Sequence, residues 1–94
     1  MTTGTCCQAT AKIVNKRGLH ARASAKLTKL AGTFSSEIFM SRNGRRVNAK
    51  SIMGVMMLAA GMGSTVTIDT EGERADEALQ SILQLIANKF GESE

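Results

Sequence analysis

The chain has 94 residues and a formal net charge of +4, with 43% hydrophobic and 21% charged residues, a composition typical of one small soluble globular domain. No run of about 20 apolar residues is present, so we expect no transmembrane helix, and the first residues lack the pattern of a secretory signal. Cys6 and Cys7 are adjacent and the chain has one histidine; we therefore expect no disulfide framework, no metal site and a cytoplasmic location.

The charge is distributed unevenly along the chain. Residues 1–50 contain ten basic residues and one acid, Glu37, whereas residues 51–94 contain two basic residues and seven acids. This asymmetry predicts a basic surface that attracts an anionic partner, the alternative being a solvated surface without a partner. A nucleic acid fits the sign of the charge, but the chain has no Trp, no Tyr and three Phe for base stacking. We therefore expect no nucleic-acid partner.

The first quarter of the chain predicts a strand followed by a helix. Residues 1–7 are expected to form a disordered tail. Gln8–Val14 alternates apolar and polar residues, which is typical of a strand with one buried face. A helix is predicted over Ala21–Ala31, because apolar residues recur there on one stripe and Gly32 follows as a natural stop.

A hairpin and a short helix are predicted next. Strands over Phe34–Ser41 and Arg45–Ala49 flank Asn43-Gly44, a pair typical of a type I′ turn because both residues accept a positive φ. Ser51 then opens a helix as its N-cap, since its hydroxyl can accept a backbone N–H that has no partner within the helix. That helix is expected to end near Gly61.

The last part of the chain predicts a strand over Ser64–Thr70 and a helix from Glu73 to Phe90, with acids at its start and Lys89 at its end. The order is therefore β-α-β-β-α-β-α, which predicts an α+β fold with helices on one face of a single sheet. We expect one domain over residues 8–91 and a C-terminal tail over residues 92–94.

The segment from Gly18 to Arg22, Gly-Leu-His-Ala-Arg, is the candidate for chemistry. His20 is predicted at the first turn of a helix, where the N–H groups of Ala21, Arg22 and Ala23 lack helical partners and attract phosphate. A neutral imidazole has a free lone pair and can act as a nucleophile, and the Arg22 guanidinium can bind a phosphoryl group. The alternative is an ordinary capping or surface histidine, and no Asp or Glu is identifiable in the sequence as a partner that orients the ring.

A second candidate segment is Lys50-Ser-Ile-Met-Gly-Val-Met56. The simplest interpretation makes Ser51 a helix cap and the apolar residues part of the core. A partly exposed helix rich in methionine would instead form an adaptable docking surface. A phosphate on Ser51 would lie at a helix N-terminus, where the helix dipole tolerates negative charge.

Together the two segments resemble HPr, the family of histidine-containing phosphocarriers of the bacterial phosphoenolpyruvate-dependent phosphotransferase system, over about Ala9 to Phe90. The first is similar to the family's phosphorylation motif and the second to its regulatory-serine motif. The resemblance implies an open-faced β-sandwich, with a four-stranded antiparallel sheet covered on one face by three helices. The family usually has Pro after the arginine, where this chain has Ala23; because Ala is a good helix former, we expect the helix to persist.

The resemblance also implies a function. His20 would be phosphorylated on Nδ1 by phospho-enzyme I and would pass the phosphoryl group to an enzyme IIA domain, with Arg22 balancing its charge. Ser51 would be modified by an HPr kinase/phosphorylase in bacteria that have one. The protein would be a carrier without turnover of its own and without a cofactor. The alternative is a mainly regulatory paralogue, in a nitrogen-related branch or binding kinases and transcription regulators, instead of a carrier for sugar uptake.

Partners are expected to dock on the basic half of the molecule around an apolar centre, and we expect the carrier itself to be a monomer. Charge attraction would make the association sensitive to salt. The expected docking residues are Leu19, Lys26, Ile52, Met53 and Met56.

Overall fold

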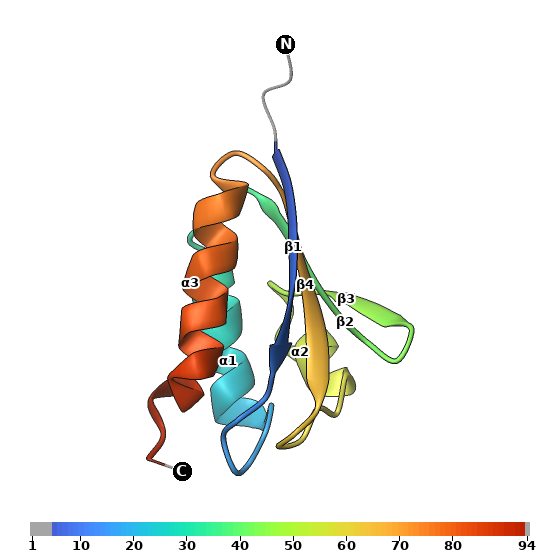
Figure 1. Ribbon diagram of the computed structural model, residues 1–94, viewed down its shortest axis with the longest axis vertical. Helices are drawn as coiled ribbons and strands as arrows, with labels where there is room; N and C mark the ends of the chain where they lie inside the picture. The colour runs from blue at the N-terminus through green and yellow to red at the C-terminus, as the bar shows by residue number, and fades with distance from the viewer. Residues whose placement is uncertain (1–4, 94) are drawn as a thin grey trace.

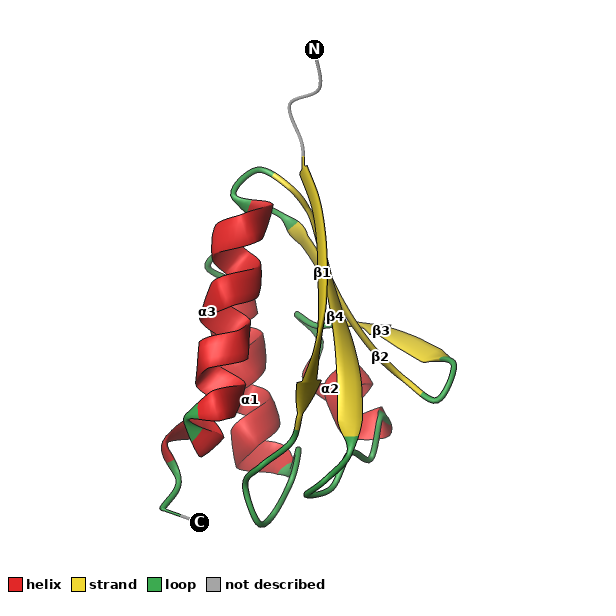
Figure 2. Cartoon of the chain, viewed as in Figure 1, coloured by secondary structure: helices red, strands yellow, loops and turns green. Residues whose placement is uncertain are grey.

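Strands and helices alternate in the predicted β-α-β-β-α-β-α order along residues 5–93, the part of the chain that the computed structural model describes (Figures 1 and 2). The strands and helices in chain order are β1 (Thr5–Lys12), α1 (Ala21–Ala31), β2 (Glu37–Arg42), β3 (Arg45–Asn48), α2 (Ile52–Met57), β4 (Thr65–Gly72) and α3 (Ala75–Ala87), followed by the 3-10 turn η1 (Lys89–Gly91). This confirms the α+β fold.

The four strands form one antiparallel sheet in the order β1-β4-β2-β3. Figure 1 shows α1 and α3 on one side of this sheet, where α3 packs against β1 and β4, and α2 packs against α1 and β3. Alternate residues of the two central strands point into the core between sheet and helices, among them Ile38, Met40, Val66 and Ile68, which are at most 1% exposed. The other face of the sheet carries no helix of the described chain, as in the predicted open-faced sandwich.

The sheet begins earlier than the sequence predicts. Thr5, Cys6 and Cys7, expected to belong to a disordered tail, form the first residues of β1. They pair with the last three residues of β4, where Cys6 lies opposite Glu71 and Cys7 opposite Thr70. Because β4 continues to Gly72, two residues beyond its predicted end, it offers backbone partners that a local pattern does not reveal. Residues 1–4 of the predicted tail lie outside the described residues.

The predicted hairpin between β2 and β3 is confirmed at its turn. Asn43 and Gly44 both have positive φ, 53° and 83°, as a type I′ turn requires. β2 starts at Glu37 instead of Phe34, because the Phe34 N–H donates to the Ala31 carbonyl at 3.2 Å and so continues the turn that ends α1. The helix at Ala23 persists without the family's usual proline, since α1 is continuous through this residue.

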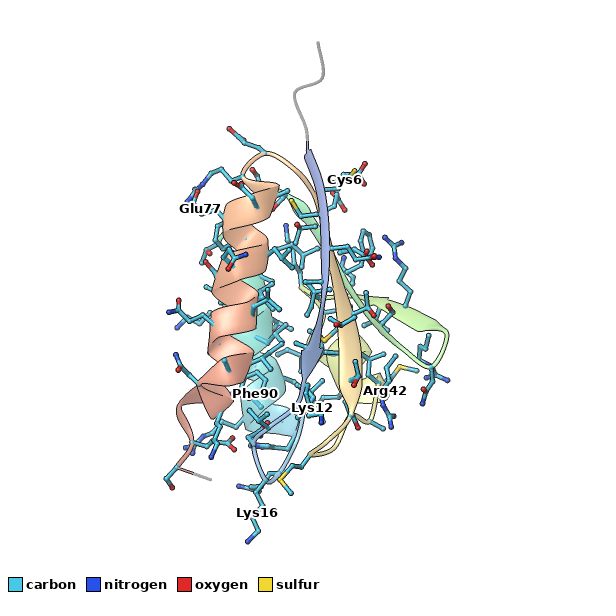
Figure 3. All side chains as sticks on the ribbon, in the orientation of Figure 1. Cys6, Lys12, Lys16, Arg42, Glu77 and Phe90 are labelled. Carbon is cyan, nitrogen blue, oxygen red and sulfur yellow. The ribbon has the colours of Figure 1, made fainter. Side chains whose placement is uncertain are left out.

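The last helix is shorter than predicted, and its end redirects the chain. α3 stops at Ala87, and Lys89 and Phe90 adopt left-handed backbone angles, with φ of 57° and 56°. The Phe90 side chain is fully buried, at 0% exposure, and its carbonyl accepts a hydrogen bond from Lys26 Nζ of α1 at 2.7 Å. Figure 3 labels Phe90 at this end of α3. The turn therefore directs the C-terminal residues back toward the start of α1.

Candidate functional site

His20 ends the loop between β1 and α1 and is the N-cap residue of α1. Its backbone is extended, with φ −72° and ψ 178°, and its side chain makes no capping hydrogen bond. Its carbonyl accepts the first helical hydrogen bond, from the Ser24 N–H at 2.8 Å. The ring is partly accessible, with 17% of the side-chain surface exposed. The structure therefore places the imidazole at a helix N-terminus, a position that favours anions.

The residues of the first turn of α1 differ in their exposure to solvent. Ala21 and Arg22 are exposed, whereas Ala23 is buried at 0% exposure, on the stripe that continues with Leu27 and Ala31. The Ala23 residue faces the core, and the phosphate-binding role of its N–H stays a prediction. Two of the three predicted N–H groups, those of Ala21 and Arg22, belong to residues that an anion can approach.

Contacts with the segment after α2 hold the loop before His20. The Leu19 N–H donates to the Ala60 carbonyl at 2.9 Å, and the Ser24 hydroxyl donates to the Leu19 carbonyl at 3.0 Å. Gly18 has φ 67°, and a Cβ built on it would lie 2.5 Å from the Ala60 carbonyl oxygen. Only glycine fits this approach of two backbones, so the loop that positions His20 depends on Gly18.

A carboxylate from the far end of the chain contacts the His20 ring. Nε2 of His20 lies 2.5 Å from Oε2 of Glu92, and Oε1 of Glu92 accepts a hydrogen bond from Nδ2 of Asn15 at 3.1 Å. The hydrogen bond with His20 is the main cause that holds the pKa of the Glu92 carboxyl below its ordinary value; burial opposes it, and Asn15 and the Arg17 charge add to it. Glu92 is thus an orienting partner that the sequence analysis did not find.

Part of the predicted C-terminal tail is therefore part of the site. Glu92 is 72 positions from His20 in the sequence, and no local pattern links the two. The side-chain surface of Glu92 is only 15% exposed, so this residue of the predicted tail packs on the domain. Glu94 lies outside the described residues.

Basic side chains lie beside the pair formed by His20 and Glu92. A surface cavity of about 410 Å³ opens next to the Glu92 carboxylate. Its lining residues are Arg17, Arg22, Lys26, Gly91, Glu92 and Ser93. The cavity combines three basic side chains with the start of α1, an arrangement suited to a doubly charged anion such as a phosphoryl group.

Ser51 is the N-cap of α2, as predicted from the sequence. Its backbone is extended, and its hydroxyl oxygen accepts a hydrogen bond from the Gly54 N–H at 3.1 Å. The residue is exposed, so the hydroxyl is also accessible to a modifying enzyme.

The apolar residues of α2 divide between core and surface. Val55 is fully buried and fixes α2 against the rest of the domain. Leu58, the residue that follows α2, is also buried, at 3% exposure. Five other large apolar side chains of α2 and of the turn that follows are exposed, by 38% to 72%. They are Ile52, Met53, Met56, Met57 and Met62. We call these five residues the methionine surface.

The methionine surface lies near the His20 loop, because the hydrogen bond between Leu19 and Ala60 joins the two segments. Leu19 itself is 5% exposed and belongs to the core cluster. Its predicted role as a docking residue is therefore wrong, since its side chain has almost no surface to offer. The sequence could not distinguish its loop position from a surface position.

The sequence of this chain is similar to those of known proteins. A family model described as "PTS HPr component phosphorylation site" matches residues 7–88. The chain is 70% identical over 82 residues to the phosphocarrier protein HPr of Cupriavidus necator, covering 87% of this chain and 92% of that protein. The chain belongs to the HPr family of phosphocarrier proteins.

Other HPr family members agree with this assignment. The chain is 49% identical over 83 residues to the phosphocarrier protein HPr of Neisseria meningitidis serogroup A, covering 88% of this chain and 93% of the relative. Its fold is similar to the crystal structure of HPr-C-His from Thermoanaerobacter tengcongensis, with TM-score 0.90 and 42% identity, covering 94% and 99% of the two chains. HPr family membership makes the protein a carrier of phosphate in the phosphotransferase system and not an enzyme with turnover of its own.

Residues 5–93 of this HPr family member hold no group of three or more His, Cys, Asp or Glu side chains placed to bind a metal ion. None of its helices has the length and the apolar character needed to cross a membrane.

Proposed function

We propose that His20 accepts a phosphoryl group on Nδ1 from phospho-enzyme I and donates it to an enzyme IIA domain, and that Ser51 is a site of regulatory phosphorylation. Phosphoenolpyruvate is the original donor in this scheme. The carrier acts in the cytoplasm as a monomer and passes the group on without a cofactor.

The observation that carries the proposal is the position of His20 as the N-cap of α1 beside a cavity lined by Arg17, Arg22 and Lys26. The exposed first turn of α1 supplies N–H donors, and the guanidinium of Arg22 supplies a second source of positive charge. Because the ring is partly exposed, a phosphoryl group on it stays within reach of the next protein. A carrier needs such a shallow site, since it must release what it accepts.

The methionine surface supports a docking role close to His20. Exposed methionine side chains adapt to different partner surfaces, and the basic side chains of α1, among them Lys26, attract acidic partners. Ser51 caps the helix that carries most of this surface. A phosphate there would add negative charge to the same contact and so weaken docking to an acidic partner.

Incubation with phosphoenolpyruvate, Mg²⁺ and enzyme I, followed by intact mass, tests the carrier function. We expect the wild-type protein to gain one acid-labile phosphoryl group that the His20→Ala variant does not gain. Ser51→Ala is the matched control and should gain the group like the wild type. A wild-type protein that gains no label, or a His20→Ala variant that gains it equally, overturns the proposal.

A separate incubation with ATP and an HPr kinase tests Ser51. We expect one acid-stable phosphoryl group on the wild-type protein and on His20→Ala, and none on Ser51→Ala. If the wild type takes up no label, Ser51 is a helix cap and not a regulatory site.

A further inference from the structure

The contact between Glu92 and His20 determines which ring nitrogen can react. An ionised carboxylate has oxygen acceptors and no proton to donate. At 2.5 Å from Glu92 Oε2, Nε2 of His20 must therefore be the nitrogen that carries a hydrogen. In a neutral ring the other nitrogen, Nδ1, then has the free lone pair.

The fold holds both the Glu92 carboxylate and the chain just before it in place. Asn15, which is fully buried, donates from Nδ2 to Glu92 Oε1 at 3.1 Å and to the Gly18 carbonyl at 2.8 Å. The same amide thus ties the C-terminal segment to the loop that carries His20. On the other side, buried Phe90 and its hydrogen bond from Lys26 anchor the chain two residues before Glu92. The carboxylate is therefore positioned by the fold and is not a freely moving side chain.

We propose that Glu92 is the positioning residue of the phosphoryl-transfer site: it holds His20 with the proton on Nε2, leaves Nδ1 as the nucleophile, and stabilises the positive charge that develops on the ring during transfer. This inference rests on the proposed function and adds to it the reason why one ring nitrogen is the acceptor.

The chemical step balances as follows. The Nδ1 lone pair of His20 forms a bond to phosphorus, and the bond between phosphorus and the donor atom breaks, with its electron pair remaining on the donor. The Nε2 proton stays on the ring, which now carries a positive charge balanced by the Glu92 carboxylate. When the phosphoryl group moves on to the acceptor, the electron pair returns to Nδ1 and the ring is neutral again.

The basic side chains beside this pair cannot replace Glu92 as the partner of the ring proton. Arg17, Arg22 and Lys26 line the cavity and are hydrogen-bond donors only, so none of them can accept the Nε2 proton's hydrogen bond. Removal of Glu92 therefore leaves no charged acceptor among the residues that line this cavity.

Nitrogen-15 NMR of the imidazole tests the tautomer directly. At about pH 8.5, where an ordinary imidazole is neutral, we expect the wild type to show one dominant tautomer, with the proton on Nε2 and a slowly exchanging Nε2–H signal. In Glu92→Ala we expect a mixture of the two tautomers and loss of the slow exchange. Glu37→Gln, a charge-removing change at an exposed strand residue of β2, should match the wild type.

Steady-state kinetics distinguish a role of Glu92 in positioning the ring from a role in docking to enzyme I. In phosphorylation by enzyme I, we expect Glu92→Ala to lower kcat roughly tenfold, a modest loss for a residue that orients a histidine. We expect the KM for the carrier to change less than about twofold, because the substitution alters no docking residue. Glu92→Asp keeps the charge and should recover part of the rate. Glu37→Gln should keep both constants.

The two arms also distinguish this inference from the proposed function. A Glu92→Ala protein with the wild-type tautomer and wild-type kcat overturns the role of Glu92 while His20 remains the carrier residue. If His20 takes up no phosphoryl group in any variant but the tautomer changes as expected, the carrier function is wrong and the positioning of the ring by Glu92 stands.

Discussion

Side chains from both ends of the domain lie beside His20, where Glu92 contacts the ring and Asn15 holds Glu92. Asn15 comes from the loop after β1 and Glu92 from the segment after η1, and they are 77 positions apart in the sequence. Each of the two side chains is at most 15% exposed, so their hydrogen bonds are shielded from water and hold their geometry. The surroundings of the His20 ring therefore include residues that are not its neighbours in the chain.

The hydrogen bond between Glu92 and His20 is expected to make the stability of the fold depend on pH. Because the pKa of Glu92 is lowered in the folded protein, mainly by its hydrogen bond with His20, its stabilising contribution is present above the ordinary carboxyl pKa and is lost as the pH falls through the lowered value. We expect the wild type to be more stable than Glu92→Gln at about pH 7 and the difference to shrink by about pH 3. Urea unfolding at the two pH values measures it; a difference that grows in acid contradicts it.

The positions of α1 and α2 depend on contacts between the loops next to them. The loop before α1 packs on the segment after α2, where Gly18 meets the Ala60 carbonyl, and Val55 buries one side of α2. The same helix exposes most of the methionine surface on its other side. A helix of only six residues needs support from outside the helix to be stable, and here the Ser51 cap and the buried Val55 provide it. The methionine surface and the loop that carries His20 are therefore joined through the hydrogen bond between Leu19 and Ala60 and through the packing of α2 on α1.

Substitution at Gly18 tests that contact. Gly18→Ala adds a Cβ that would lie 2.5 Å from the Ala60 oxygen at a residue with φ 67°, so we expect a loss of about 2 kcal/mol or more of unfolding free energy. Gly61→Ala is the matched control, because nothing lies within 4 Å of its added Cβ, and it should cost less than about 1 kcal/mol. Thermal and urea unfolding of both variants compare them; equal losses would show that the backbone approach is not tight.

The Ser51 cap is expected to stabilise the short helix α2. Ser51→Ala removes the acceptor for the Gly54 N–H and should lower the unfolding free energy by about 1 kcal/mol. Ser51→Asp keeps an oxygen at the cap and adds charge that the helix start tolerates, so it should stay within about 0.5 kcal/mol of the wild type. Urea unfolding measures both; a Ser51→Ala protein as stable as the wild type would show that the cap contributes nothing.

Across the whole molecule, the fold gathers cations and apolar surface on neighbouring segments. Arg17, Arg22 and Lys26 face one cavity at the start of α1, and α2 with the methionine surface packs against the same helix. Many of the acids of the second half lie instead near the start of α3, at the opposite end of that helix from the turn that carries Phe90 (Figure 3). The unequal charge of the two halves of the chain thus places basic side chains at one end of the molecule and many acidic side chains at the other.

Association with enzyme I tests this surface. We expect the double variant Arg22→Glu and Lys26→Glu to bind enzyme I roughly tenfold more weakly at about 0.05 M salt, and the difference to narrow at about 0.5 M as the charges are screened. Arg45→Glu, at the exposed start of β3 in the β2–β3 hairpin, is the control and should bind like the wild type. Titration calorimetry at both salt concentrations measures the effect; unchanged binding of the double variant contradicts electrostatic docking at this end.

The sequence alone determined the order of the elements, the turn at Asn43 and Gly44, the cap at Ser51 and the place of His20 at the start of a helix. These features follow from rules that act over a few residues: side-chain period, preferred backbone angles and unpaired N–H groups. The tertiary structure alone decided that Glu92 contacts His20, that Leu19 is buried, that Ala23 faces the core and that Thr5–Cys7 extends the sheet. Those outcomes depend on which distant segments pack together, because burial and long-range hydrogen bonds are properties of the assembled core and not of any local stretch of chain.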